Sequence, residues 1–365
     1  MNRSLSILVI TNRYPNPGKM YAGHYVASHV AYHRAAGLNV RVLSPDHKSN
    51  SDCGFLKGYG SLLLALLPHL MSGRFDLVHA HWAFPSGMLG AALASVRNRP
   101  LLLTEHGTYS TRLQQKGRFA RWIAPGVMRR ANHIIWVGEG QPDALEAAGT
   151  LIASPQSVIP MGIHYPETLI SREEARMVLG IAPTTTLLLF AGNLEYHKGP
   201  DILLEAIAGL VKAGIRCHAV FAGQGPAQAD LKAMTDGLNI LANVQFIGGK
   251  APERLGIWRA AADICVVPSR QESFGLAAFE AMASGSAVVA SAIGEMKRAI
   301  THGENGFLFP AGNVQALQTL LQHLISDPDR VVAVTRPARQ AAAPLRYEIQ
   351  AERVLSLYRQ LTAPR

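Results

Sequence analysis

Short apolar segments alternate with helix-like segments along the whole chain, in two successive sets. The first half contains six apolar segments with the length of buried strands: 5–10, 40–43, 76–79, 100–104, 133–137 and 157–159. The second half contains six more: 186–191, 218–221, 244–246, 263–267, 287–290 and 306–309. Strands separated by helices are typical of parallel βαβ units. The pattern therefore predicts two Rossmann-like α/β domains, with ligand sites at the carboxyl ends of their strands.

The alternation is interrupted between residues 163 and 171, in a stretch where Pro160, Gly162 and Pro166 break the pattern. We place the domain boundary there. The expected segments are an N-terminal domain over 1–165, a C-terminal domain over 166–345 and a terminal helix within 346–365.

Composition narrows the class of protein. The chain has 365 residues, 48% of them hydrophobic and 16% charged, which fits two globular domains and argues against disorder. Its three cysteines, Cys53, Cys217 and Cys265, do not make a disulfide framework, so we expect reduced thiols. The N-terminal apolar run is too short for a signal peptide, and no stretch approaches the roughly 18 apolar residues of a membrane span. We therefore expect a cytoplasmic protein.

The formal net charge of +10 is compatible with nucleic acid, an anionic membrane or acidic small molecules as partners. Part of this charge lies beside an apolar stripe that contains Phe119 and Trp122, as in helices that lie on anionic membranes. The basic residues of this cluster are Arg112, Lys116, Arg118, Arg121, Arg129 and Arg130. Peripheral membrane association and an ordinary solvated helix face both remain open. The sequence contains no zinc knuckle, RRM-like aromatic pattern or helix-turn-helix signal, so we expect no nucleic-acid partner.

The segment 268–285, PSRQESFGLAAFEAMASG, carries the most specific chemical signal. It follows an apolar strand and enters a helix that is apolar nearly all round, with Glu280 as its one charge. Such a helix belongs in the interior, where a carboxylate needs partners. A strand, a turn of small residues and a helix N-terminus also form a phosphate site. The segment therefore predicts a pyrophosphate at the start of the helix and a sugar hydroxyl on Glu280.

Glu272 lies eight residues before Glu280, and the whole segment resembles the E-x7-E signature of family 4 of the retaining glycosyltransferases, which have the GT-B fold. The resemblance implies two Rossmann-like domains that face each other across a cleft, the first binding the acceptor and the second the nucleotide sugar. It also implies that the terminal helix returns to the first domain. The implied activity is transfer of a hexose from a UDP- or GDP-linked sugar to a hydroxyl acceptor, with retention of configuration.

The resemblance also implies roles for single residues. Glu280 would hold the ribose hydroxyls and Glu272 the hydroxyls of the donor sugar. Lys198 matches the lysine that grips the diphosphate, and Gly223 lies in the family's Gly-x-Gly-Pro turn. The implied donor-binding residues are Gly23, Asn193, Lys198, Gly223, Arg270, Ser273, Phe274, Gly275, Leu276 and Glu280. We expect Glu280→Ala to abolish transfer and to leave the melting temperature nearly intact.

Two strand ends in the first half supply further candidates. His106, in the sequence TEHG, matches a family histidine that contacts the transferred sugar or the acceptor, and it joins Lys198 and Glu272 in the implied catalytic set. His79 and His81 end the preceding strand and resemble the family's acceptor-side loop. A metal site would need a third ligand, and none lies at a recognisable spacing. We expect neither a metal nor a cofactor.

Two positions depart from the family pattern. Asn193 stands where the family has an arginine, and Arg298 stands where it has the glutamate of Gly-Gly-x-x-Glu. A catalytically inactive nucleotide-sugar-binding scaffold is therefore the main alternative. The E-x7-E context argues against an epimerase, and the incomplete glycine fingerprint argues against a dehydrogenase. For the acceptor, charge placement and family habit favour a lipid-linked or polysaccharide intermediate of a bacterial surface polysaccharide, at the inner face of the cell membrane.

Overall fold

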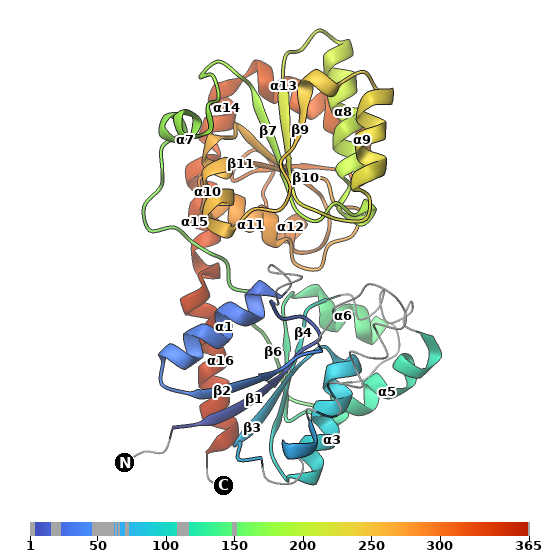
Figure 1. Ribbon diagram of the computed structural model, residues 1–365, viewed down its shortest axis with the longest axis vertical. Coiled ribbons are helices and arrows are strands. Elements are labelled where there is room, and N and C mark those ends of the chain that lie inside the picture. Colours follow the sequence, from blue (N-terminus) through green and yellow to red (C-terminus); the bar gives the residue numbers. More distant parts are fainter. Residues whose placement is uncertain are drawn as a thin grey trace. The chain divides into compact units, whose positions relative to one another are not determined.

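Contacts within the chain divide the computed structural model into two compact units (Figure 1). One unit comprises Met1–Gly162 together with Tyr347–Arg365, and the other comprises Ile163–Arg346. The structure describes residues 4–15, 23–45, 62, 64, 66–69, 73–107, 117–147 and 152–363. Cys53, Arg112 and Lys116 lie outside these ranges, as do the side chains of Arg118, Phe119 and Arg121.

The N-terminal unit is built on a parallel sheet whose described strands follow the order β2-β1-β3-β4-β5-β6. These strands are β1 (Ser6–Ile10), β2 (Asn39–Leu43), β3 (Leu77–His81), β4 (Leu101–Glu105), β5 (His133–Trp136) and β6 (Gln156–Val158). The helices are α1 (His24–Ala35), α3 (Met88–Val96), α5 (Gly117–Arg130), α6 (Gly140–Ala147) and α16 (Tyr347–Thr362), with a π-helical turn at Ala83–Gly87. The strand order reverses between β1 and β3, which places the topological switch point of this sheet at their carboxyl ends.

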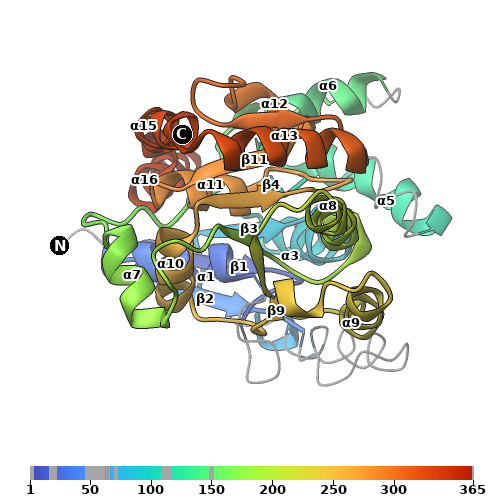
Figure 2. The same cartoon turned by 90° about the horizontal axis from the view of Figure 1, so that it is seen from above.

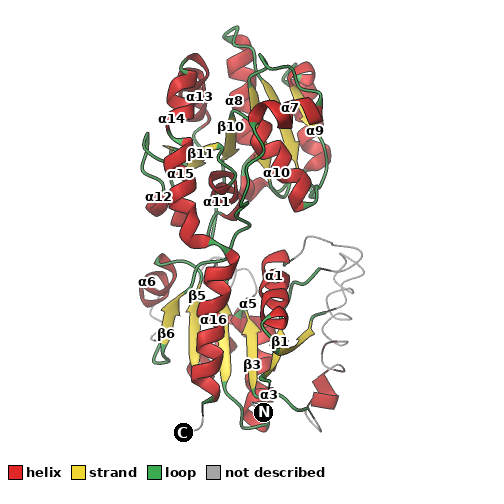
Figure 3. Ribbon diagram, turned by 90° about the vertical axis from the view of Figure 1, so that its left-hand side faces the viewer, coloured by secondary structure: helices red, strands yellow, loops and turns green. Residues whose placement is uncertain are grey.

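Both faces of this sheet are covered, because its strands are apolar at nearly every position. Along β1, Leu8 and Ile10 belong to the core on one face, and Ile7 and Val9 to the core on the other. The first core includes residues of α3 and α5, and the second includes residues of α1 and α16. The last helix of the chain therefore completes the core of the first unit (Figure 3).

The C-terminal unit contains a second parallel sheet, whose described strands follow the order β12-β11-β10-β7-β8-β9. These strands are β7 (Leu187–Ala191), β8 (His218–Ala222), β9 (Val244–Phe246), β10 (Ile264–Val267), β11 (Ala287–Ser291) and β12 (Phe307–Phe309). The helices are α7 (Arg172–Leu179), α8 (Pro200–Lys212), α9 (Gln228–Gly237), α10 (Pro252–Ala261), α11 (Leu276–Ala283), α12 (Gly294–Ala299), α13 (Val314–Ser326), α14 (Pro328–Ala333) and α15 (Thr335–Ala342). Short 3-10 turns occur at Tyr196–Lys198, Leu241–Asn243 and Ala343–Leu345. Here the switch point lies between β7 and β10.

Helix α11 lies in the interior of the C-terminal unit, as its nearly uniform apolar sequence predicts. It packs against β10, β11 and α15. Its buried side chains are Ala278, Phe279, Ala281, Met282 and Ala283. Helices cover both faces of the sheet, and α11 lies between the strands β10 and β11 and the helix α15 (Figure 2).

Two parallel sheets with helices on both faces confirm the predicted α/β class. Each predicted strand begins and ends within two residues of the strand in the structure. The largest difference is at β3, which ends at His81 rather than at His79. The strand is longer because its main chain stays paired with β4 up to the register position His81↔Thr104. His79 and His81 therefore both lie inside a central strand.

Candidate functional site

An ion pair occupies the switch point of the C-terminal sheet. Lys198 ends the 3-10 turn after β7, and Glu272 lies in the loop after β10. The Nζ atom of Lys198 lies 2.6 Å from Oε2 of Glu272. The other carboxylate oxygen accepts a hydrogen bond from the backbone N–H of Ser273 at 3.1 Å. The structure therefore brings Lys198 and Glu272 together at the strand ends where α/β sheets bind their ligands.

Helix α11 begins beside this pair. Gly275, with φ of 97°, directly precedes Leu276, the first residue of the helix. No side chain of the described part of the chain caps this helix. Its first amides can therefore donate to an anion. Phe274 is buried with its ring 4.9 Å from that of Phe279, which anchors the start of the helix in the core.

Glu280 has the partner that its apolar helix requires. The guanidinium of Arg259 on α10 donates to Oε2 of Glu280. The Arg259 side chain is 6% exposed and that of Glu280 is 14% exposed. This confirms the expectation that Glu280 needs a partner. It also changes the expectation for the stability of Glu280→Ala, because removing this carboxylate leaves a buried guanidinium uncompensated.

Arg270 ties two loops together. Its guanidinium makes two hydrogen bonds to the carboxylate of Asp201, at 2.7 and 2.6 Å, and a third to the backbone oxygen of Tyr196 at 2.8 Å. The hydrogen bonds to Asp201 raise the pKa of Arg270 above its ordinary value. A contact between Arg270 and a diphosphate stays a prediction, and it would require Arg270 to share or release Asp201.

The turns after β7 and β8 touch through their backbones. A Cβ atom at Gly223 would lie 1.8 Å from the backbone oxygen of Gly192, so only glycine allows this approach. Asn193, the next residue, is exposed and donates to Oε1 of Glu195 at 3.3 Å. It brings no positive charge to the site, where Lys198 supplies the positive charge next to Glu272.

The second departure from the family pattern lies on α12. Arg298 is 45% exposed and its guanidinium lies 3.9 Å from the carboxylate of Glu295. A guanidinium cannot accept a hydrogen bond, whereas the glutamate that it replaces can. Arg298 could therefore only donate hydrogen bonds to a sugar, whereas a glutamate at this position would accept them.

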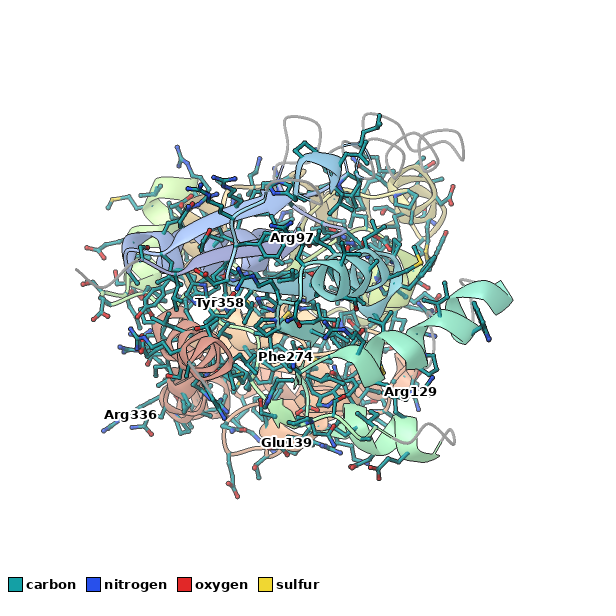
Figure 4. All side chains as sticks on the ribbon, turned by 90° about the horizontal axis from the view of Figure 1, so that it is seen from below. Arg97, Arg129, Glu139, Phe274, Arg336 and Tyr358 are labelled. Atoms are coloured by element: carbon teal, nitrogen blue, oxygen red, sulfur yellow. The ribbon has the colours of Figure 1, made fainter. Side chains whose placement is uncertain are left out.

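His79 is held on both sides by the protein. Its Nδ1 lies 2.7 Å from the hydroxyl of Tyr358 on α16, and its Nε2 lies 2.7 Å from the hydroxyl of Thr104. Figure 4 labels Tyr358 on its helix. Burial and the neighbouring His81 lower the pKa of His79 well below its ordinary value. These contacts give His79 a role in joining β3, β4 and α16, and its predicted acceptor contact remains a prediction.

His81 and His106 form a hydrogen-bonded pair at the ends of β3 and β4. Nδ1 of His81 lies 2.7 Å from Nε2 of His106, and the two rings are stacked. Tyr25 and Trp82 pack on the His106 ring at 4.8 and 4.7 Å. Burial lowers the pKa of His81 to about 3 and that of His106 well below its ordinary value, so both rings are neutral near pH 7. Nδ1 of His106 is buried and has no hydrogen-bond partner among the described residues.

Gly23 lies immediately before α1, with φ of 66°. A Cβ atom there would lie 2.2 Å from the backbone oxygen of Arg13. The start of α1 is therefore pressed against the segment that follows β1, at the switch point of the N-terminal sheet.

Helix α5 carries the described part of the basic cluster. Trp122 is 78% exposed and Arg129 is exposed, as Figure 4 shows for Arg129. Ala124, Val127 and Met128 on the same helix are buried in the core. Among the residues that the structure describes, no helix has the length and apolar composition needed to cross a membrane.

Two residues of the site were not found from the sequence. Arg259 could have been noticed as a cation in the apolar last turn of α10, since a buried cation needs a carboxylate. Asp201 gave no signal of its own, because an acidic residue next to Pro200 is ordinary at a helix start.

Comparison with known proteins gives two family matches. The model of glycosyl transferases group 1 matches residues 171–341, and that of glycosyltransferase family 4 matches residues 22–165. D-inositol 3-phosphate glycosyltransferase 1 of Catenulispora acidiphila is 33% identical over 318 residues, which is 79% of this chain and 72% of that protein.

Solved structures resemble the fold over nearly its whole length. Sucrose-phosphate synthase of Thermosynechococcus elongatus has a TM-score of 0.82 at 23% identity and covers 98% of this chain and 99% of its own. HepE of Anabaena in complex with UDP and glucose has a TM-score of 0.77 at 20% identity, and the match covers 96% of this chain and 99% of HepE. At these identities the likeness shows the fold alone. Together with the sequence match to a curated relative, it shows that the chain belongs to family 4 of the glycosyltransferases, with the α/β GT-B fold.

Proposed function

We propose that this protein transfers a hexose from a UDP- or GDP-linked sugar to a hydroxyl group of a carbohydrate acceptor, with retention of the anomeric configuration. The observation that carries the proposal is the pair Lys198–Glu272, which lies at the β7/β10 switch point next to the uncapped start of α11. One cation, a set of backbone amides and a carboxylate are the groups that a sugar diphosphate needs. In this proposal the C-terminal unit binds the donor and the N-terminal unit binds the acceptor.

The site must above all stabilise the leaving diphosphate. Negative charge develops on the diphosphate as its bond to the sugar breaks, and fixed donors that face this charge lower the barrier. Lys198 and the first amides of α11 supply those donors. Binding of the diphosphate draws Lys198 away from Glu272, and the released carboxylate then accepts hydrogen bonds from the donor sugar.

Glu280 binds the ribose hydroxyls. Its carboxylate is compensated by the buried Arg259, so it can accept from a diol without remaining an isolated charge. In the transfer step, the bond from the anomeric carbon to the phosphate oxygen breaks as the acceptor oxygen forms its own bond on the same face. The acceptor proton passes to the leaving phosphate oxygen. His106 contacts a hydroxyl of the sugar substrate.

Isothermal titration calorimetry with UDP, GDP and ADP, in the presence of EDTA, tests the donor site directly. We expect one of these nucleotides to bind, and Lys198→Ala to weaken that binding. If none of the three binds, the donor assignment is wrong. HepE was solved in complex with UDP and glucose, which supports UDP as the first nucleotide to titrate.

We further propose that the protein works at an anionic membrane surface on a lipid-linked acceptor. The exposed Trp122 and the basic residues of α5 support this proposal. The test is sedimentation with vesicles that contain 30% phosphatidylglycerol, as about that fraction makes a bilayer strongly anionic. The variant replaces Arg118, Arg121, Arg129 and Arg130 by glutamine. The control replaces the exposed Lys212, Lys232, Arg254 and Arg336 of the C-terminal unit and so loses the same net charge.

Only the first variant should be released from the vesicles, and equal binding of both would contradict the proposal. The curated relative is named for D-inositol 3-phosphate. Transfer to that compound in a bilayer-free assay would favour a small polyol phosphate as the acceptor instead.

The alternative is a nucleotide-sugar-binding scaffold without activity. Asn193, which supplies no cation, and Arg298, which cannot accept a hydrogen bond, support it. Nucleotide binding without turnover on any donor and acceptor pair would favour the scaffold.

A further inference from the structure

The side chain of Gln141 is an unusual feature of the N-terminal unit. Both Nε2 and Oε1 of this residue are buried, and neither has a hydrogen-bond partner among the described residues. A primary amide offers two donors and two acceptors. Native proteins seldom bury such a group unsatisfied, and an exception calls for a specific reason. A ligand that completes these hydrogen bonds is such a reason.

Gln141 lies at the ligand-binding edge of the sheet. It is the second residue of α6, which begins just beyond the end of β5 (Figure 3). Its backbone N–H donates to the oxygen of Gly138 at 3.3 Å, so the segment after β5 turns directly into the helix. The backbone N–H of Val137 donates to the oxygen of Glu105 at 3.3 Å, which holds the end of β5 against the end of β4. His106 is the next residue after Glu105. Two adjacent strand ends therefore carry Gln141 and His106.

A second unsatisfied buried atom lies at this edge, namely Nδ1 of His106. Since Nε2 of His106 is hydrogen-bonded to His81, the two rings share one N–H between them. If His81 donates, Nδ1 of His106 carries the proton and donates to a ligand. If His106 donates, its Nδ1 accepts. A hydroxyl group can satisfy Nδ1 in either arrangement, because it is both donor and acceptor.

The charges around these groups do not favour an anion. The amide is uncharged and the imidazole pair is neutral. Charged groups of both signs occur here: the Arg13 guanidinium acts on His106, and the Glu105 carboxylate accepts from the backbone N–H of Ala83. Two carboxylates, Glu139 and Asp143, flank Gln141 in the sequence and would disfavour an anion.

We propose that Gln141 is a specificity-determining residue that binds adjacent hydroxyls of a neutral sugar, with Nδ1 of His106 as the neighbouring contact. One hydroxyl donates to Oε1 and the next accepts from Nε2. The proposal rests on the proposed glycosyl transfer and names the substrate class that the N-terminal unit recognises. The sugar is either part of the acceptor or the hexose of the donor, and the experiments distinguish the two sources.

The first experiment measures the melting temperature of Gln141→Leu without added ligand. If the amide has no hydrogen-bond partner until a ligand binds, an apolar side chain of similar size removes the free-energy cost of burying it unsatisfied. The melting temperature should then rise by about 2–4 °C. The matched control is Gln360→Leu, which replaces an exposed glutamine on α16 of the same unit and should change little. A fall in the melting temperature of Gln141→Leu would show that the amide serves the fold, and would overturn the proposal.

The second experiment follows the amide itself. In protein labelled with 15N-glutamine, the side-chain signal of Gln141 is the one that disappears in Gln141→Leu. One arm adds UDP-glucose or GDP-mannose; the other adds methyl α-glucoside, methyl α-mannoside or myo-inositol in the presence of UDP. A shift in the first arm assigns the site to the donor hexose, and a shift in the second alone assigns it to the acceptor. No shift in either arm overturns the proposal. A larger shift with inositol 3-phosphate than with myo-inositol overturns the neutral class.

Kinetics separate this proposal from the function on which it rests. Gln141→Leu should raise KM for the sugar that shifts the signal about tenfold or more, the loss expected when a hydrogen bond to a substrate hydroxyl is removed, and should leave kcat within about threefold. The calorimetric Kd for the nucleotide should not change. Failure of nucleotide binding would defeat the proposed function, whereas the melting and amide-signal experiments still decide the role of Gln141.

Discussion

Lys198 and Glu272 neutralise each other across the switch point of the C-terminal sheet, with Nζ 2.6 Å from Oε2. Their side chains are 26% and 11% exposed, so the pair is only partly withdrawn from solvent. The pair holds both side chains in one place, and loss of either partner would leave the other charge uncompensated in a largely buried position. The arrangement keeps the cation and the carboxylate ready at the strand ends without leaving either charge alone.

Replacement of Lys198 by alanine should reduce kcat about 100- to 1000-fold, because in the proposed mechanism it removes a donor that faces the charge of the leaving diphosphate. The melting temperature should fall less than in Glu280→Ala, since Glu272 keeps the hydrogen bond from the backbone N–H of Ser273 and the Lys198 side chain is 26% exposed. Steady-state kinetics with the nucleotide sugar selected by calorimetry give the answer. Lys212→Ala, at the exposed end of α8, is the control. Wild-type turnover in Lys198→Ala would remove Lys198 from the mechanism.

Glu280→Ala should abolish transfer and also destabilise the C-terminal unit by about 3–5 kcal/mol, because Arg259 is left buried without its counter-charge. Hydrogen exchange of α10 and α11, measured by mass spectrometry, should increase. The double variant Glu280→Ala with Arg259→Met should recover protection but not activity. If the double variant is as unprotected as the single one, the charge pair is not the cause.

Acid should destabilise the N-terminal unit before the C-terminal unit. Burial lowers the pKa values of His79, His81 and His106, and that of His81 to about 3. The unfolded chain binds protons below its own pKa of about 6.5 and the folded unit does not, so stability falls as pH drops from 6.5 toward 3. At pH 5 the loss is roughly 2 kcal/mol for each fully shifted histidine.

Urea unfolding at pH 7.5 and pH 5.0, followed by tryptophan fluorescence, checks this pH dependence. In a Trp258→Phe background the remaining tryptophans, Trp82, Trp122 and Trp136, all report on the N-terminal unit. His323→Gln, at an exposed position of α13, should leave the pH dependence unchanged. Equal unfolding midpoints at the two pH values would contradict the assignment of neutral buried histidines.

Tyr358→Phe should cost the N-terminal unit about 1–2 kcal/mol, because it leaves Nδ1 of His79 buried without its partner. The urea midpoint of that unit reports the change. Tyr32→Phe, at a half-buried position on α1, is the matched control and should cost less. Equal effects would show that the hydrogen bond between Tyr358 and His79 contributes nothing.

Local patterns in the sequence were sufficient to predict the strands and the position of the E-x7-E segment. Apolar runs bounded by turns locate strands because a parallel sheet buries both of its faces. The strand-turn-helix pattern likewise places Glu272 and Glu280 at a strand end and on an interior helix. The need of Glu280 for a partner also follows from its apolar surroundings.

Local sequence patterns did not identify which side chains contact one another across different elements. Arg259 contacts Glu280 across two helices, Asp201 contacts Arg270 from a different strand-helix unit, and Tyr358 reaches His79 from the last helix of the chain. Each pairing depends on which elements the fold brings together, and many charged or hydroxyl residues would have satisfied the same local requirement. The buried Arg259 therefore changes what we expect of Glu280→Ala, from unchanged stability to a loss of stability.

The return of α16 to the first unit has a consequence for synthesis on the ribosome. The sheet face that contains Ile7, Val9 and Leu77 needs Val354 and Leu355 to complete its core. These two residues emerge only after the whole of Ile163–Arg346 has been made. At ordinary elongation rates the first unit therefore waits on the order of 10 s with one apolar face uncovered, while the second unit can close as soon as it leaves the exit tunnel. The half that is made first is the half that finishes last.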